Sequence, residues 1–187
     1  RYVLAEAFPA FLARSPVDAI EAMVAAVEAQ AARETGTDLD TVTEVATIDG
    51  LFPFVADRSF VWAWDIEDSH PSDAEKLLQT TVTFLTEAAA EPVLTAAMTL
   101  RSTARCGLLW SRFLHAASRR ADVLGDLAWP IASAGGFLVA SETSKDAIDA
   151  ALAIAPLRTP DERAAFERTL LDLDVSSFKE PAVAHNF

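Results

Sequence analysis

Four segments of the chain follow the pattern Ser/Thr-x-x-acid, which marks the first turn of a helix. They are residues 15–18, 72–75, 143–146 and 159–162. In this pattern the hydroxyl of the first residue and the carboxylate of the fourth accept hydrogen bonds from backbone N–H groups that the helix leaves unpaired. Pro16 and Pro160 stand at the first helical position, where a missing N–H costs nothing. Apolar residues at helical spacing follow each segment, so the pattern predicts a chain built from helices.

The composition favours the same fold class. About one residue in five of the 187 is alanine, and glycine occurs only six times. Alanine is the strongest helix former and glycine one of the weakest, so this bias predicts an all-α protein with closely packed helices. A hydrophobic content of 51% excludes a disordered chain, and the length fits a single helical domain over residues 1–187.

The apolar periodicity predicts helices over residues 3–14, 16–36, 72–90, 93–119, 123–131, 143–155 and 160–173. Residues 35–71 break this regularity and are interpreted as an aromatic-rich irregular insertion or connection. Within this segment Phe60, Trp62 and Trp64 alternate with smaller residues, which fits either a short strand or a buried helix. We expect helix or irregular structure there, with the aromatic rings filling a gap between helix pairs.

Antiparallel helix pairs joined by short Pro or Gly turns resemble HEAT and armadillo repeats. The pairs are residues 3–14 with 16–34, residues 72–90 with 93–119, and the helices on either side of Gly135. The resemblance implies a HEAT-like α-solenoid segment, and a start at Arg1 rather than Met indicates a piece of a longer chain. A compact helical bundle is the alternative, because the helix starts do not keep the period of about 40 residues that such a repeat would have.

Basic residues cluster where acidic residues are absent. No Asp or Glu occurs between Glu91 and Asp122, although the whole chain carries a net charge of −13. If residues 93–119 form one helix, five side chains fall within about 40° of one meridian. They are Arg101, Arg105, Arg112, His115 and Arg119. These five residues, the basic stripe, form the candidate binding site, because guanidinium groups suit carboxylates and phosphates.

Two interpretations of the basic stripe stay open. Its arginines could pair with acids of the same or a neighbouring helix, for which Glu87, Glu91, Asp122 and Asp126 are at hand. Alternatively, the stripe is exposed and binds a partner. Leu108 lies in its middle, which favours contact with a protein surface over contact with a nucleic-acid backbone. The acidic flanks also repel nucleic acid.

The densest group of possible metal ligands is residues 65–73, which carry four carboxylates and His70. Their spacing does not match a calcium loop, and acids ahead of a helix favour the positive end of its dipole. We interpret the segment as a solvated loop, with a small helical enzyme that binds a metal there as an alternative. The chain has no Gly-rich phosphate loop, no histidine pair at helical spacing and no Gly-x-Ser-x-Gly turn. We therefore expect no catalytic activity, no cofactor and no metal.

The single Cys106 has no disulfide partner, which fits a reducing compartment. No apolar run approaches the roughly 20 residues that span a bilayer, so no membrane contact is expected. Together these features predict a non-catalytic helical scaffold or regulatory module of a cytoplasmic, bacterial protein. Its partner would be another protein or another domain of its own chain. Nucleic-acid or nucleotide binding through residues 93–119 is the alternative.

Overall fold

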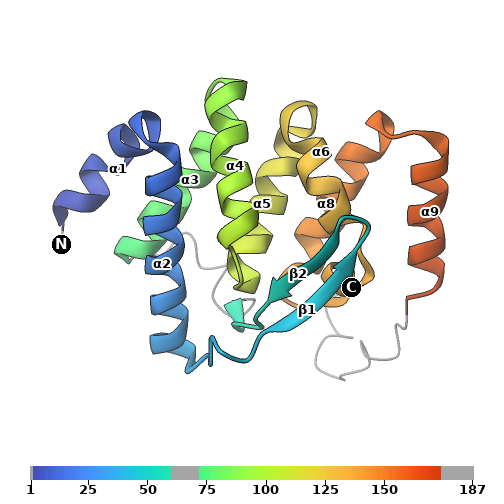
Figure 1. Ribbon diagram of the computed structural model, residues 1–187, viewed down its shortest axis with the longest axis horizontal. Helices are drawn as coiled ribbons and strands as arrows, with labels where there is room; N and C mark the ends of the chain where they lie inside the picture. Colours follow the sequence, from blue (N-terminus) through green and yellow to red (C-terminus); the bar gives the residue numbers. More distant parts are fainter. Residues whose placement is uncertain (1, 60–71, 174–187) are drawn as a thin grey trace, which may run out of the picture.

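The computed structural model describes residues 2–59 and 72–173, which are mostly helical with one small two-stranded sheet (Figure 1). The first elements are α1 (Tyr2–Arg14), α2 (Pro16–Thr35), β1 (Thr43–Thr47), β2 (Gly50–Phe54) and α3 (Asp73–Glu87). They are followed by α4 (Ala90–Thr103), α5 (Gly107–Arg119), α6 (Ala121–Ala132), α7 (Gly135–Val139), α8 (Ser144–Ile154), the short 3-10 helix η2 (Ala155–Leu157) and α9 (Pro160–Leu171). The all-α prediction is therefore correct apart from the sheet. Across the two described ranges, no helix is both long enough and apolar enough to cross a membrane.

Helices begin at all four start signals, but only two of the signals are complete capping boxes. Ser72 and Thr159 each accept a hydrogen bond from the third helical N–H, and the glutamate at that position accepts one from the cap residue. Ser15 and Thr143 also stand just before helices, yet their hydroxyls make no capping bond. The acidic residue at the fourth position explains the difference. A glutamate completes the boxes that begin at Ser72 and Thr159, whereas the shorter aspartate follows Ser15 and Thr143.

The helices up to α8 pack in two rows. α1, α3, α5 and α8 pack successively against one another in the first row, and α2, α4 and α6 in the second. Figure 1 shows α2 and α4 in front of α3 and α5. α9 stands at the right-hand edge and has no buried residue, but the ring of its Phe166 meets Trp129 of α6 edge-on at 5.5 Å.

α5 is the central helix of the core, because it packs against α3, α4, α6 and α8. Trp110 and Phe113 of α5 are fully buried. Each aromatic side chain of this kind removes on the order of 150–250 Å² of surface from water. Leu108, in the middle of the basic stripe, is buried as well. The sequence interpretation that part of the stripe faces protein is thus correct at this position.

The segment between α2 and α3 contains a β-hairpin that the sequence did not predict. Thr43 pairs with Phe54 and Thr47 with Gly50 in an antiparallel register. Gly50 has a φ of 127°, which only glycine adopts readily, and this closes the turn. The interpretation of residues 35–71 as irregular is therefore wrong for residues 43–54, whereas residues 60–64, for which helix or irregular structure was expected, lie outside the described ranges.

The hairpin lies across the lower ends of the helices, where its aromatic side chains meet the core (Figure 1). The ring of Phe52 meets Trp110 edge-on at 5.7 Å, and Phe54 meets Phe137 of α7 at 5.6 Å. The indole Nε1 of Trp110 donates a hydrogen bond of 3.0 Å to the carbonyl of Pro53. The hairpin thereby closes the core over α5.

The contact between β1 and α7 requires a glycine. A Cβ atom on Gly136 would stand 2.6 Å from Cγ1 of Val45 on β1, which is closer than carbon atoms approach. At the neighbouring Gly135, a Cβ atom would meet the end of the Leu173 side chain at 3.3 Å and Cγ2 of Thr169 at 3.8 Å, which is an ordinary contact distance. Gly136 therefore sets how closely the hairpin approaches the helices.

Candidate functional site

The basic stripe is divided by a break between two helices. α4 ends at Thr103 and α5 begins at Gly107, because Ala104 and Cys106 adopt extended backbone angles. The N–H of Val55 donates to the carbonyl of Arg105 at 2.8 Å, and the N–H of Gly107 donates to the carbonyl of Val55 at 3.0 Å. The prediction of one uninterrupted helix over residues 93–119 is therefore wrong. The chain leaving the hairpin takes the hydrogen bonds that a continuous helix would make.

A buried carboxylate caps the N-terminus of α5. Asp57 is fully buried, and its Oδ2 accepts a 2.9 Å hydrogen bond from the N–H of Leu108. Its Oδ1 accepts a second bond of 2.9 Å from the N–H of Ser59. Negative charge at a helix N-terminus is favourable because it faces the positive end of the helix dipole. The exit of the hairpin thus both interrupts the long helix and caps the helix that follows.

The two arginines before the break form ion pairs with acids from distant parts of the chain. Nη2 of Arg101 lies 2.7 Å from Oδ2 of Asp49 at the hairpin turn, and its guanidinium lies 5.0 Å from the centre of the Phe52 ring. Arg105 donates two hydrogen bonds to Glu28 of α2. These bonds and the charge of Glu28 raise the pKa of Arg105 above its ordinary value. Arg101 thus joins the hairpin to the end of α4, and Arg105 joins α2 to the α4–α5 connection.

Two residues after the break meet one carboxylate on α8. Nδ1 of His115 lies 3.6 Å from Oδ1 of Asp146, and the hydroxyl of Ser111 donates to Oδ2 at 2.5 Å. Burial alone would raise the pKa of Asp146. The hydrogen bonds from His115 and Ser111, together with the charge of Arg112, outweigh that effect and hold this pKa below its ordinary value. Burial also lowers the pKa of Arg112, and the charge of Asp146 opposes that shift.

This cluster contains a serine, a histidine and an aspartate, but its geometry differs from that of a hydrolase. The Ser111 hydroxyl donates to the carboxylate and not to the imidazole, so this cluster lacks the serine–histidine hydrogen bond of a hydrolase triad. Ser111 is also buried. The cluster therefore serves as a polar link between α5 and α8.

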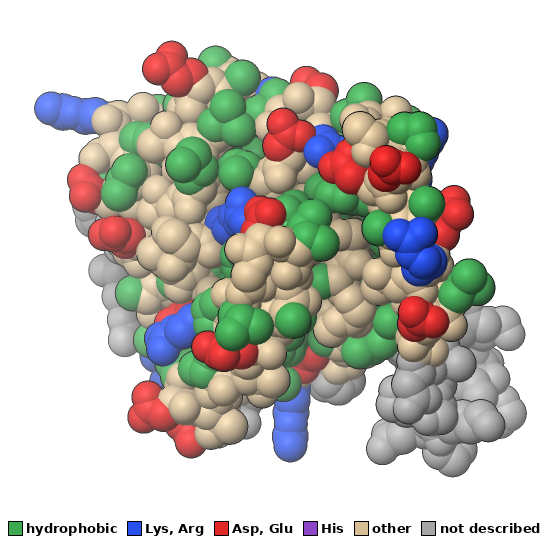
Figure 2. Space-filling view, turned by 45° about the vertical axis from the view of Figure 1, so that its right-hand side comes forward, with side chains coloured by type: hydrophobic (Ala, Val, Ile, Leu, Met, Phe, Trp, Pro, Cys, Tyr) green, Lys and Arg blue, Asp and Glu red, His purple; other side chains and the backbone are tan. Residues whose placement is uncertain are grey.

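The five residues of the basic stripe accordingly do not share one exposed face. Arg101 lies in the last turn of α4, Arg105 lies in the connection before α5, Arg112 and His115 belong to the α5–α8 contact, and Arg119 is exposed on the last turn of α5. Figure 2 shows one face of the molecule, on which Lys and Arg side chains are scattered and form no continuous basic strip. Of the proposed acidic partners, Asp122 pairs with Arg120 at 3.6 Å and Asp126 with Arg158 at 2.5 Å.

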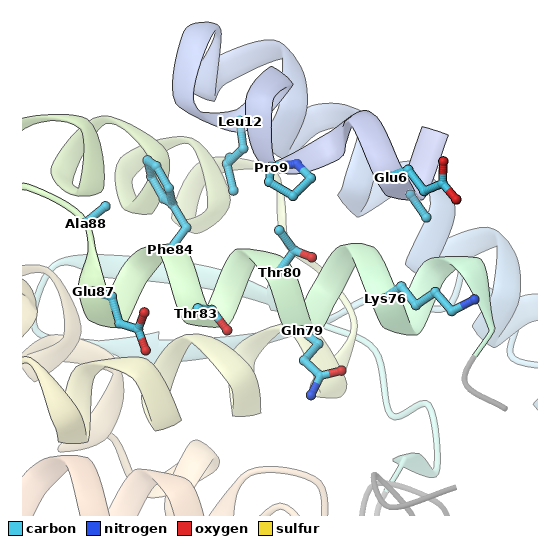
Figure 3. Close-up of a pocket in the computed structure, with 11 residues that line it drawn as sticks. Glu6, Pro9, Leu12, Lys76, Gln79, Thr80, Thr83, Phe84, Glu87 and Ala88 are labelled. Atoms are coloured by element: carbon cyan, nitrogen blue, oxygen red, sulfur yellow. The ribbon is translucent and has the colours of Figure 1, made fainter. Parts of the chain in front are cut away.

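A hollow in the described surface lies between α1 and α3. It is a groove of about 840 Å³, and its walls are shown in Figure 3. Its residues are Ala5, Glu6, Pro9 and Leu12 of α1, Lys76, Gln79, Thr80, Thr83, Phe84 and Glu87 of α3, and Ala88 just beyond α3. Thr80 and Phe84 point toward α1, while Glu87 lies at one end of the groove and Glu6 and Lys76 lie at the other. Grooves of this size, with an apolar lining and a few polar groups, are typical of ligand sites.

The groove was missed by sequence reasoning, although its signal is present. Residues 76, 79, 80, 83, 84 and 87 recur at helical spacing along one face of α3. The face opposite, with Leu77, Leu78 and Leu85, is the buried one. From the sequence alone, a helix face of Thr, Phe, Gln and charged residues is interpreted as an ordinary solvent-exposed surface. Only the position of a second helix beside it reveals a groove.

The acidic segment 65–73 lies mostly outside the described residues. Of its members, Asp73 begins α3 and lies 4.0 Å from Lys76. Within residues 2–59 and 72–173, no group of His, Cys, Asp and Glu side chains is placed to hold a metal ion. Comparison with known proteins adds no assignment, because no family model, curated protein or solved structure matches this chain.

Proposed function

We propose that this chain is a non-catalytic helical module that binds a segment of another protein, or of another domain of its own chain, in the groove between α1 and α3. The groove itself carries this proposal. It is open, it is lined by apolar side chains such as Pro9, Leu12 and Phe84, and polar side chains stand along its length. Binding sites commonly combine an apolar surface with a few polar groups that fix the orientation of the ligand.

The arrangement of the helices supports the role of a scaffold. α1, α3, α5 and α8 follow one another in one row, with α1 and α8 at its opposite ends in Figure 1, and α2, α4 and α6 form the second row. We propose that this is a HEAT-like solenoid segment, because such repeats stack helix pairs side by side and bind partners along the exposed rows. A compact bundle would instead place its helices around one shared axis.

Nucleic-acid binding through residues 93–119 gains no support from the ion pairs of Arg101 and Arg105. Their guanidinium groups contact Asp49 and Glu28, so contact with a phosphate would first require breaking these pairs. The strong salt dependence of phosphate contacts would reveal such binding if it occurred.

The proposal is tested by panning the purified chain against a phage library of random peptides. We expect enriched peptides whose affinity falls by about tenfold or more in the variant Thr83→Arg, because an arginine on this exposed position of α3 would fill the groove. The matched control is Met98→Arg, which adds the same side chain at a position of α4 that is 59% exposed. Circular dichroism and the melting temperature show that both variants fold.

A result in which no enriched peptide distinguishes Thr83→Arg from Met98→Arg would refute the groove as the binding site. If a protein-binding surface lies elsewhere, enriched peptides would bind both variants as tightly as the original chain.

A further inference from the structure

Each end of the groove carries a glutamate, and Lys76 lines the end where Glu6 lies. Within the described ranges neither Glu6 nor Glu87 forms an ion pair, whereas Lys76 lies 4.0 Å from Asp73 and makes further contacts. Figure 3 places Glu87 at one end of the groove and Glu6 at the other. A ligand that lies along the groove therefore meets Glu87 at one end, and at the other end it meets Glu6 with Lys76 beside it. Opposite charge on the ligand would increase both the rate of association and the specificity of binding.

The wall formed by α3 offers polar groups that the protein itself does not use. In helices a threonine hydroxyl often donates to the carbonyl four residues earlier. Thr81 and Thr86 of α3 do this, donating to Leu77 and Val82. Across the described residues, the side chains of Thr80, Thr83 and Gln79 make no hydrogen bond. Their donors and acceptors are available to a ligand.

The free side-chain groups of α3 favour a ligand with an extended backbone, whose repeat of about 6.6 Å is near but not equal to the helical repeat of about 5.4 Å. Along one face of a helix, side chains repeat every turn, at about 5.4 Å. In an extended chain, backbone groups on the same side repeat every second residue, at about 6.6 Å. A helical ligand would already have used its backbone N–H and C=O groups internally and would leave the threonine hydroxyls unpaired. The stretch of α3 from Lys76 to Glu87 rises about 16 Å, which is the length of about five extended residues.

We infer that the occupant of the groove is an extended peptide segment of about five residues with alternating apolar side chains and a basic residue at each end. Its backbone bonds to Gln79, Thr80 and Thr83, its apolar side chains cover Pro9 and Phe84, and its basic ends meet Glu6 and Glu87. This inference rests on the proposed function, because it specifies the ligand of the same groove.

The test uses two pools of fluorescein-labelled peptides that differ only at their ends. Both pools alternate a mixture of Val, Ile and Leu with a mixture of Ser and Thr, and one pool ends in Lys at both sides while the other ends in Glu. Fluorescence anisotropy with the whole chain should show at least about tenfold tighter binding of the Lys-ended pool. This preference should decrease at high salt and reverse in the variant Glu6→Lys/Glu87→Lys.

The hydrogen bonds are tested with near-isosteric substitutions. Thr80→Val/Thr83→Val removes only the two hydroxyl groups and should weaken binding of the Lys-ended pool by about tenfold. The matched control is Thr86→Val, whose hydroxyl is occupied within α3 and which should leave binding unchanged.

The inference is overturned if neither pool binds, if the Glu-ended pool binds as tightly as the Lys-ended pool, or if both threonine variants behave alike. Any of these outcomes would refute the extended basic peptide as the ligand. The proposed function would still stand if the phage selection yields peptides whose binding is weakened by Thr83→Arg. The proposed function itself fails only when that selection yields no peptide that depends on the groove.

Discussion

Arg105 and Glu28 form a bidentate ion pair, although 77 residues separate them in the sequence. Nε of Arg105 donates to Oε1 of Glu28 at 3.2 Å, and Nη2 donates to Oε2 at 2.5 Å. The side chain of Glu28 is only 7% exposed, whereas that of Arg105 is 38% exposed. The pair therefore secures the α4–α5 connection to a buried charge on α2.

Removing the arginine of this pair should destabilise the fold. Arg105→Ala leaves the buried carboxylate of Glu28 without its partner, and we expect the free energy of unfolding to fall by about 2 kcal/mol. This figure is below the values for fully buried pairs because Arg105 is partly solvated. Urea denaturation measures the change. In a double-mutant cycle, Arg105→Ala and Glu28→Gln should lower stability by less than the sum of their separate effects. Arg119→Ala, at an exposed position, is the control, and an equal effect of Arg105→Ala would contradict the structural role of the pair.

The close approach of β1 to α7 predicts a substitution and its rescue. Gly136→Ala should lower the free energy of unfolding by about 1–3 kcal/mol, because the new methyl group would overlap Cγ1 of Val45. The further substitution Val45→Ala removes that atom and should recover part of the loss. Gly135→Ala is the matched control and should have a smaller effect, since only the flexible end of Leu173 must move. Thermal denaturation of the variants decides the matter, and an identical melting temperature for both alanine variants would argue against the contact.

Asp146 should make stability depend on pH in the acid range. Its pKa in the folded protein lies below the ordinary value of 3.8, so the unfolded state binds the proton more readily. The stabilisation is therefore complete above about pH 4 and is lost as the pH falls through the folded pKa. Asp146→Asn should destabilise the protein by about 1–2 kcal/mol near neutral pH and flatten the dependence below pH 4. Denaturant titrations over this range measure both effects. Asp149→Asn on the same helix, where Lys145 pairs at the surface, should keep the original profile.

Cys106 should be unreactive until the protein unfolds. Burial, followed by the charges of Asp57 and Glu28, raises the pKa of its thiol to about 12, so little thiolate exists near neutral pH. At about pH 8, Ellman's reagent should react with the native protein at least about a hundredfold more slowly than with the denatured protein. Fast reaction of the native chain would mean that the connection before α5 opens readily.

The positions of most helices could be predicted because their signals are local. Hydroxyl and acidic residues at the helix starts, the scarcity of glycine and the apolar spacing act over a few residues, and α2, α3, α8 and α9 begin where these signals stand. The break between α4 and α5 could not be predicted in this way. Nothing within Ala104 to Cys106 opposes a helix, and the break is made by Val55 and Asp57, about fifty residues earlier.

The same limit applies to the candidate sites. The sequence indicated that the arginines could pair with acids, but it suggested acids close by in the chain. Asp49, Glu28 and Asp146 became partners only through packing. The groove depends on two helices, and each of its walls taken alone has the composition of a solvated surface. Its binding role stays a prediction.

The backbone contact of Val55 with Arg105 and Gly107 has a consequence for the order of folding. Residues 90–119 can form local helical bonds within microseconds, and without the hairpin nothing stops that helix at Thr103. The native bend requires closure of a loop of about fifty residues, which is entropically costly and slower. We expect the break between α4 and α5 to form after the helices themselves. The docking of the hairpin therefore determines where α4 ends and where α5 begins.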